Sequence, residues 1–467
     1  MILLPAAALT LSGCAVDRLR DLDVVYDLSQ QDQRDAGLFE YGAGNSSFVV
    51  LGPKVQQQEQ SRQSETSEAE EQQPAAGQSV GVLEEDFEAL PEQMELSDSK
   101  RSREDIERED EELRTRIGLT EEKIAGLIQD NQGNYYFDHM DDAGKRLYAE
   151  LLHIIRARGE KIRVSSLSEE EVDRAFQYLL ADHPELFCTD GYTYTRYTVD
   201  GELFKLGFTA RYLYDATEES IRSAEIEART AEILAGAPQT TDQYELARYV
   251  YEYIIDHTEY VIGAPDNQNI CSVFLSGQSV CQGYAKATQL LLNRLGVPTT
   301  LATGTVTAGD RPGTRHAWNM TRVNGRDYYL DTTWGDSSFQ QTASEEEPIR
   351  RINYDYLLDT TEDISDTHQL DDLVEMPLCT HLEDNYYVRD GAYFTEADPE
   401  QLDDLFRRAY DEGRATVTLK CADMGVFDAL TDRLVTDRGV FDYLRSDNNS
   451  ASFASSEMQR TLTFVLI

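Results

Sequence analysis

One cysteine stands at the start of a predicted helix in the middle of the chain. From Cys281 the apolar residues recur at helical spacing as far as Leu295, and Gly296 follows where helices commonly end. Cys281 therefore lies in or just before the first helical turn, where unpaired backbone N–H groups and the helix dipole stabilise a thiolate. The same N–H groups can hold the oxyanion that forms when a thiolate attacks an amide carbonyl.

A histidine and an aspartate follow on a predicted β-hairpin. The pair Asn324-Gly325 is a typical two-residue hairpin turn, and the register that it sets places Trp318 opposite Asp331. Side chains alternate along a strand, so His316 shares a face with Trp318. Asp331 then lies diagonal to His316, within reach of a hydrogen bond. A one-residue bulge would break this register.

A cysteine, a histidine and an aspartate in this arrangement are the parts of a thiol acyl-transfer site. The imidazole of His316 would take the proton of Cys281, and the carboxylate of Asp331 would orient that imidazole and stabilise its cation. Each residue also has a simpler interpretation. Cys281 could be a buried thiol at a helix cap, and His316 could be an ordinary core or surface histidine. Asp331, like Asp336, could simply cap a turn.

Three separated motifs resemble the transglutaminase-like superfamily of papain-like folds. They read Val280-Cys281-Gln282-Gly283-Tyr284-Ala285, His316-Ala317-Trp318-Asn319 and Tyr329-Leu330-Asp331-Thr332-Thr333-Trp334. The resemblance covers residues 215–370 and implies an α+β fold, in which the helix carrying Cys281 packs on an antiparallel sheet carrying His316 and Asp331. It also implies that Cys281 is the nucleophile, His316 the general base and acid, and Asp331 the orienting carboxylate.

The same motifs supply candidates for a substrate groove, namely Gln282, Tyr284, Trp318 and Trp334. The two tryptophans are the only ones in the chain. They either wall an acyl-binding groove or fill the core under the sheet, and packing explains Gln282 and Tyr284 equally well.

Three further features lie around the motifs. Cys271 precedes the nucleophile closely enough to raise the question of a disulfide, although nothing in the sequence brings it to Cys281. His368 closes the segment and is interpreted as structural. The polar residues 336–352 form a predicted loop that could act as a lid.

Composition excludes several classes of function. The chain has 467 residues, and its 87 acidic against 42 basic residues give a net charge of -45. A protein this acidic lacks the basic stripe of a nucleic-acid binder, so no nucleic-acid partner is expected. The six cysteines show no CxxC pair, and no dense acidic loop of the calcium-binding type is present, so neither a metal nor a cofactor is predicted.

The first residues are typical of a lipoprotein leader. An apolar run ends in Leu11-Ser12-Gly13-Cys14, which resembles the bacterial lipobox. Residues 1–13 are therefore predicted to be a signal peptide, and Cys14 to carry the lipids that anchor the protein outside the cell membrane. No basic residue precedes Cys14, which we explain by a start codon further upstream.

The remaining chain divides by composition into five predicted parts. Residues 14–54 are an ambiguous N-terminal segment, and the acidic, glutamine-rich residues 55–112 are predicted to be a disordered tether. A small α+β domain over 113–214, the transglutaminase-like catalytic domain over 215–370 and a small α/β domain over 371–467 follow. The last of these is expected to contain a hairpin over 385–394 around Asp390-Gly391.

Two classes of function remain open. The first is thiol-dependent acyl transfer or hydrolysis on peptide or isopeptide amide bonds, with an amine (crosslinking) or water (proteolysis or deamidation) as acceptor. Its substrates are expected to be proteins or peptides such as cell-wall peptides, and repulsion from the acidic surface disfavours strongly acidic ones. The alternatives are a non-catalytic envelope adaptor that keeps the fold for binding, and a redox-sensing Cys281.

Overall fold

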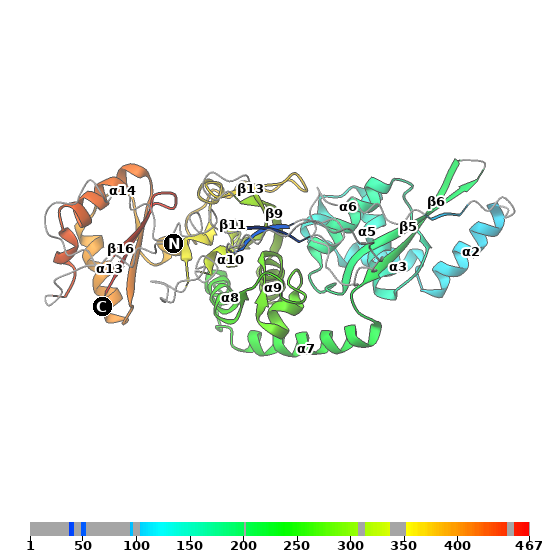
Figure 1. Cartoon of the computed structure of the whole chain (residues 1–467), viewed down its shortest axis with the longest axis horizontal. Coiled ribbons are helices and arrows are strands. Elements are labelled where there is room, and N and C mark those ends of the chain that lie inside the picture. The colour runs from blue at the N-terminus through cyan, green and yellow to red at the C-terminus, as the bar shows by residue number, and fades with distance from the viewer. Residues whose placement is uncertain are drawn as a thin grey trace, which may run out of the picture.

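A computed structural model describes residues 37–41, 48–52, 94–96, 103–199, 202–306, 313–336, 352–445 and 453–466. Three groups of elements lie in a row along the long axis (Figure 1). We call residues 94–96 and 103–212 the N-terminal unit, 216–370 the central unit and 386–466 the C-terminal unit. Outside them, β1 (Gly37–Tyr41) pairs with β2 (Phe48–Gly52).

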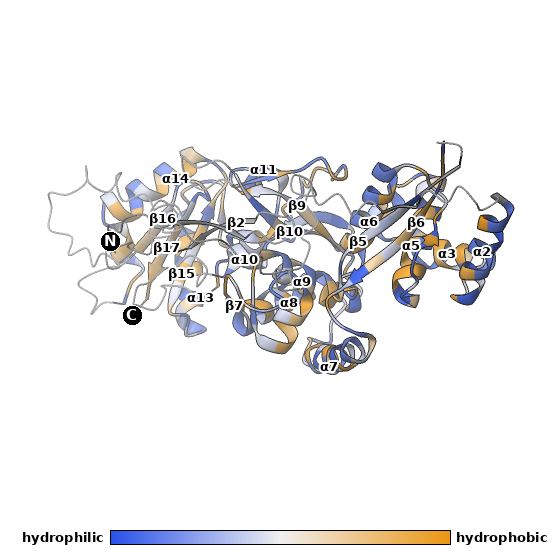
Figure 2. Ribbon diagram, turned by 45° about the vertical axis from the view of Figure 1, so that its right-hand side comes forward, coloured by the Kyte–Doolittle hydropathy of each residue, from blue (hydrophilic) through white to orange (hydrophobic). Residues whose placement is uncertain are grey.

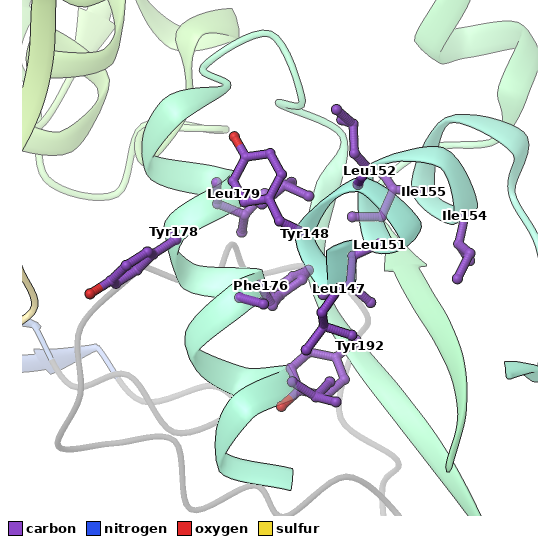
Figure 3. Packing of buried hydrophobic residues seen from close by; sticks show 14 of the residues in the cluster. Leu147, Tyr148, Leu151, Leu152, Ile154, Ile155, Phe176, Tyr178, Leu179 and Tyr192 are labelled. Carbon is purple, nitrogen blue, oxygen red and sulfur yellow. The ribbon is translucent and has the colours of Figure 1, made fainter. Parts of the chain in front are cut away.

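The N-terminal unit is an α+β layer. Its helices are α2 (Arg103–Arg116), α3 (Glu121–Asp130), α4 (Tyr135–Asp138), α5 (Asp142–Ala157) and α6 (Glu169–Asp182). They accompany a sheet of order β3 (Met94–Leu96), β5 (Thr189–Val199), β6 (Glu202–Tyr212) and β4 (Ile162–Arg163). Figure 3 shows how α5 and α6 bring Leu147, Tyr148, Leu151, Phe176 and Leu179 into one apolar cluster.

Ordered structure begins earlier than composition predicted. Helix α2 starts at Arg103, inside the range 55–112 expected to be a disordered tether. Its Asp110 is buried and pairs with the buried ammonium of Lys205 on β6. Ile106 on the same helix is buried as well, so α2 packs on the N-terminal unit although its composition alone does not favour packing.

The central unit is an antiparallel sheet with helices against it. The strand order is β12 (Leu357–Asp359), β11 (Arg326–Leu330), β10 (Thr314–Val323), β9 (Thr299–Val306) and β13 (His368–Leu370). Helix α9 (Cys281–Arg294) lies against β9 and β10, flanked by α8 (Gln243–His257) and α10 (Thr332–Gly335). Helix α7 (Ala216–Ala235) lies on the outside of the unit in both views (Figures 1 and 2).

The hairpin of β10 and β11 forms in the predicted register. Val323 lies opposite Arg326, and the pairing continues to Asn319 opposite Leu330. The ladder stops there, because the chain leaves the sheet at Asp331 and starts α10. The predicted pairing of Trp318 with Asp331 is therefore not part of the ladder.

The C-terminal unit has a sheet of order β14 (Tyr393–Phe394), β15 (Thr416–Cys421), β17 (Thr461–Val465) and β16 (Phe453–Ser456). Helices α13 (Pro399–Asp411) and α14 (Met424–Thr431) pack on it. The hairpin predicted over 385–394 is wrong. The side chain of Asn385 accepts a hydrogen bond from the N–H of Tyr387 and so caps α12 (Tyr386–Arg389), and only two residues of strand follow.

Both outer units contact the central unit. From the N-terminal unit, Tyr136 Oη donates to Leu301 O at 2.8 Å. From the C-terminal unit, Lys420 Nζ lies 3.8 Å from Asp359 and Asp363. Among the helices of the described ranges, none has both the length and the apolar character needed to cross a bilayer.

Candidate active site

The structure places Cys281 at the first residue of α9. Val280 precedes it in an extended conformation and provides no side-chain cap, so no side chain of the N-cap residue competes for the N–H groups of the first turn. The thiol is free and 95% buried. This is the position that the sequence predicted, at the end of the helix that favours an anion.

His316 and Asp331 come together as predicted, although Asp331 has already left the hairpin ladder. His316 Nε2 lies 2.6 Å from Asp331 Oδ2, and both side chains are buried. Asp331 Oδ1 meanwhile accepts the N–H groups of Thr333 at 2.7 Å and Trp334 at 3.0 Å, which caps α10. Asp331 thus caps a turn and orients an imidazole, one oxygen for each task.

Cys281 and His316 interact across the interface between helix and sheet. Burial by itself lowers the pKa of His316, but the charge of Asp331 and hydrogen bonds with Asp331 and Cys281 hold that pKa well above its usual value. Because Nε2 binds Asp331, Nδ1 is the nitrogen left for the thiol. The arrangement can store the thiol proton as an imidazolium.

A second histidine binds the same carboxylate, and sequence reasoning missed it. His368 Nε2 lies 3.0 Å from Asp331 Oδ2, and Thr367 Oγ lies 2.7 Å from His368 Nδ1. Burial lowers the pKa of His368, which favours the neutral ring. A carboxylate only accepts hydrogen bonds, so in the neutral ring Nε2 carries the proton.

Asp331 itself is held as an anion. Burial raises the pKa of a carboxyl group, but the charge of His316 and the hydrogen bonds of His316 and His368 hold the pKa of Asp331 below its usual value. In the described ranges, His316, Asp331 and His368 are the cluster with ligand atoms close enough to hold a metal ion, all within 4.8 Å of one another. An ion there would displace the proton that His316 shares with Asp331.

The two tryptophans enclose the histidines. Trp318 stacks on His316 with ring centroids 5.9 Å apart, and Trp334 meets the His316 ring edge-on at 6.3 Å. Both indoles are almost fully buried. They therefore shield the imidazoles from water. Of the two roles considered for the tryptophans, groove wall and core, this is the core role.

The remaining groove candidates differ from each other. Tyr284 is fully buried, and its hydroxyl lies 2.9 Å from both Thr258 O and Asp336 Oδ2, which is a packing role. Gln282 is 1% exposed, and neither atom of its amide has a hydrogen-bond partner. Cys271 and Cys281 are both free thiols, so no disulfide joins them. Burial raises the pKa of Cys271 to about 12.

Some predictions fall outside the described residues. Cys14 and most of the expected tether belong to this part of the chain. Asp336 and Ile352, at the ends of the predicted lid, form an antiparallel bridge, and residues 337–351 between them are not described.

Comparison with known proteins points to one family. Residues 227–332 match the family model of the transglutaminase-like superfamily, and this range contains Cys281, His316 and Asp331. No curated protein matches the chain.

Several solved structures are similar to part of the chain. A TGase is 14% identical with a TM-score of 0.22, covering 34% of this chain and 47% of that one. A proposed cysteine protease from Cytophaga hutchinsonii is 17% identical with a TM-score of 0.21, covering 23% and 37%. A proposed protease from Parabacteroides distasonis is 15% identical with a TM-score of 0.18, covering 29% of each chain. This chain thus spans less than half the length of each structure.

Proposed function

We propose that this protein is a thiol-dependent acyltransferase or hydrolase that acts on amide bonds of proteins or peptides. The observation that carries the proposal is the contact of His316 with both other members of the triad. Its Nε2 lies 2.6 Å from Asp331 Oδ2, and its ring hydrogen-bonds with Cys281.

The chemistry follows from these contacts. Cys281 gives its proton to His316, and the thiolate attacks the amide carbonyl. The oxyanion lies at the N-terminus of α9, where backbone N–H groups stabilise it. His316 then protonates the leaving amine, a thioester remains on Cys281, and an amine or water takes the acyl group.

The test is the reaction of the full chain with iodoacetamide, followed by peptide mapping. We expect Cys281 to be labelled fastest and His316→Ala to slow its labelling. Four other buried thiols serve as internal controls, because burial raises their pKa values: Cys188, Cys271, Cys379 and Cys421. Equal labelling of all five, unchanged by His316→Ala, would overturn the proposal in favour of the adaptor.

The acceptor is identified by partition of the acyl-enzyme. Incubation of the protein with a peptide donor and a fluorescent primary amine in H₂¹⁸O gives either an amine-linked product or an ¹⁸O-labelled acid. The first product indicates crosslinking and the second indicates proteolysis or deamidation.

In this proposal the protein acts at the outer face of the cell membrane, held by lipid on Cys14. Anchoring is tested by fractionation of cells that express the protein. Wild type is expected with the membranes, and Cys14→Ser in the soluble fraction.

A further inference from the structure

A cavity of about 850 Å³ lies between the N-terminal and central units. One wall comes from residues between 132 and 139 and from 182–185, and the other comes from the second half of α9, the start of β9 and the hairpin of β10 and β11. Cys281, His316 and Asp331 do not line it. The cavity is therefore separate from the candidate active site, and it is large enough for a short peptide segment.

Two buried polar side chains in the walls of this cavity keep an atom without a hydrogen-bond partner. Gln289 is 1% exposed and Thr300 is 4% exposed. Gln289 Nε2 donates to Ala181 O at 2.9 Å, but its Oε1 has no partner, and neither has Thr300 Oγ1. Burying an unpaired polar atom costs free energy, so each case needs an explanation. An amide oxygen only accepts and a hydroxyl can accept, so a ligand that donates hydrogen bonds would satisfy both.

The wall formed by the N-terminal unit adds negative charge. Asp138 and Asp182 line the cavity, and neither forms an ion pair with a lysine or an arginine in the described ranges. Asp182 accepts the backbone N–H groups of Tyr136 and Phe137 instead. Burial nevertheless raises the pKa of Asp182 to about 6, so a cation beside this carboxylate would stabilise its charged form.

The two arginines that line the cavity are already paired. Arg322 binds Asp327 through Nε and Nη2 at 2.8 and 2.9 Å, and Arg294 binds Glu227 through both of its Nη atoms at 3.0 and 3.1 Å. Both contacts are bidentate, which fixes each guanidinium in place. Neither arginine is therefore free to bind an anionic ligand, and the unpaired charge in the cavity is negative.

An organic cation suits these groups better than a metal ion does. In the described ranges, the cluster of three side chains close enough to hold a metal ion is that of His316, Asp331 and His368. The carboxylates of the cavity do not form a group of that kind. Leu290 and Met320 give the cavity an apolar part, on which the aliphatic stem of a lysine or an arginine can pack.

We propose that this cavity binds a basic segment of a partner peptide or protein, whose lysine or arginine side chain donates to Gln289 Oε1 and Thr300 Oγ1 beside the carboxylates of Asp138 and Asp182. The inference goes beyond the proposed function, because none of these four residues belongs to the triad. The net charge of -45 attracts basic segments at long range. The contacts inside the cavity then select among them at short range.

Fluorescence anisotropy of the full chain tests the site with a labelled pentapeptide that contains two lysines. The matched peptide has norleucine in place of both lysines, so it keeps the aliphatic stems and loses the charge. At physiological salt, which screens long-range attraction, we expect the lysine peptide to bind about tenfold more tightly. Equal binding of the two peptides would overturn the proposal. Spermidine at the concentration of the peptide should displace little of it, and full displacement would indicate a site for free polyamines and would also overturn the proposal.

Two matched charge changes separate local binding from overall charge. Asp138 and Asp403 are both exposed, and Asp403 lies on α13 of the C-terminal unit, so Asp138→Asn and Asp403→Asn remove the same charge at distant places. Asp138→Asn keeps an oxygen that can accept the N–H of Gly133, so the fold should persist. We expect Asp138→Asn to weaken binding of the lysine peptide about threefold, and Asp403→Asn to leave it nearly unchanged. Equal effects would show that the peptide responds only to net charge, which contradicts the proposal.

Thr300→Val tests the unpaired hydroxyl. Removing a buried hydroxyl that has no partner relieves a cost, so the variant should unfold at the temperature of wild type or higher, yet bind the lysine peptide about threefold more weakly. Thr418→Val is the matched control, because Thr418 Oγ1 hydrogen-bonds with Thr463 Oγ1 at 2.9 Å in the C-terminal unit. It should unfold at a lower temperature and bind the peptide as wild type does. A Thr300→Val protein that binds normally, or that loses stability as the control does, would overturn the proposal.

The same titration in Cys281→Ala protein separates this site from the proposed function. Cys281 does not line the cavity, so the lysine peptide should bind as tightly as it does to wild type. An inert Cys281 together with an intact preference for lysine would defeat the proposed function and leave this site standing. Loss of binding in Cys281→Ala would place the peptide at the triad and overturn the proposal.

Discussion

Asp331 serves α10 through one oxygen and two histidines through the other. Its charge keeps the pKa of His316 high, so the imidazolium persists until the pH rises through that raised value. Asp331→Asn removes the charge, and the pKa of His316 should fall by about 1–3 units. We therefore expect the Cys281–His316 ion pair to form less readily, so that labelling of Cys281 begins at higher pH than in wild type.

The measurement is the rate of Cys281 alkylation across pH in wild type and Asp331→Asn. The variant keeps an oxygen that can cap α10, so circular dichroism should show an intact fold. An onset of labelling at the same pH in both proteins would show that Asp331 does not control His316.

His368 is a positioning residue in our interpretation, because it acts on Asp331 and not on the thiol. His368→Leu removes a hydrogen bond to a charged group, a loss of about 1.5–3 kcal/mol. We expect Cys281 labelling to slow by about 10- to 100-fold and its pH profile to shift. His368→Gln, whose amide can donate to Asp331, should restore part of the rate.

The control for His368 is His139→Gln, a change at an exposed histidine of the N-terminal unit. It should leave labelling unchanged. If His368→Leu lowers the unfolding temperature but keeps both rate and pH profile, His368 is only a structural residue, as the sequence suggested.

Of the two histidines that bind Asp331, only His316 could be predicted from the sequence. His316 was linked to Asp331 by a two-residue turn, a local feature that fixes the register. His368 lies 37 residues beyond Asp331 on a short strand that pairs with β9. No periodicity or spacing in the sequence predicts that His368 comes back to Asp331, because this contact depends on the pairing of β13 with β9.

At the scale of elements, the start of α9 depends on Gly283. A Cβ there would lie 2.0 Å from Ser279 Oγ and 2.9 Å from Asn267 O. Ser279 Oγ already hydrogen-bonds with Ser272 Oγ at 2.6 Å and with Asn267 O at 3.0 Å, so it has little freedom to move. Gly283→Ala should therefore displace the first turn of α9 and the thiol with it.

Thermal unfolding and iodoacetamide labelling measure this effect. We expect Gly283→Ala to lower stability by about 1–3 kcal/mol and to slow the labelling of Cys281. Gly126→Ala in α3 is the matched control, because nothing lies within 4 Å of its Cβ. Higher helix propensity should stabilise that variant by about 0.5–1 kcal/mol. Equal effects of the two changes would contradict the argument.

Two turns show when a hairpin can be predicted. Asn324 and Gly325 both have positive φ, 50° and 83°, as a two-residue hairpin turn requires. In the wrongly predicted hairpin, only Gly391 has a positive φ, 63°, while Asp390 has φ -85°. Gly391 therefore ends a short helix. The sequence pairs look alike, and the cap by Asn385 and the buried Tyr387 decide between them.

At the scale of the whole molecule, the sequence predicted separate domains, whereas in the structure the N-terminal and central units share one apolar core. Composition could not predict that Ala285, Leu301 and Ala317 of the central unit share one apolar cluster with the N-terminal unit. These contacts join surfaces distant in sequence, and small apolar residues on them do not signal an interface. The joint matters for function, because α9 carries Cys281 at one end and docks the N-terminal unit through Gln289.

Buried charged side chains lie at the interface between the central and C-terminal units. Lys420 on β15 is fully buried beside Asp359 and Asp363, and Arg460 also pairs with Asp363. Lys420→Met would leave Asp359 without its cation. We expect the free energy of unfolding to fall by about 3–5 kcal/mol, against about 0.5 kcal/mol or less for the exposed Lys123→Met.

The pH dependence of that loss tests its cause. Burial raises the pKa of Asp359 well above its usual value, and Lys420 counters this effect. An acid with a raised folded pKa costs no stability below its unfolded pKa of about 4 and costs progressively more as pH rises. The difference between wild type and Lys420→Met, measured by urea unfolding, should therefore be small at pH 4 and large at pH 8. A difference that is constant across pH would indicate lost packing of the lysine stem and not an unpaired buried carboxylate.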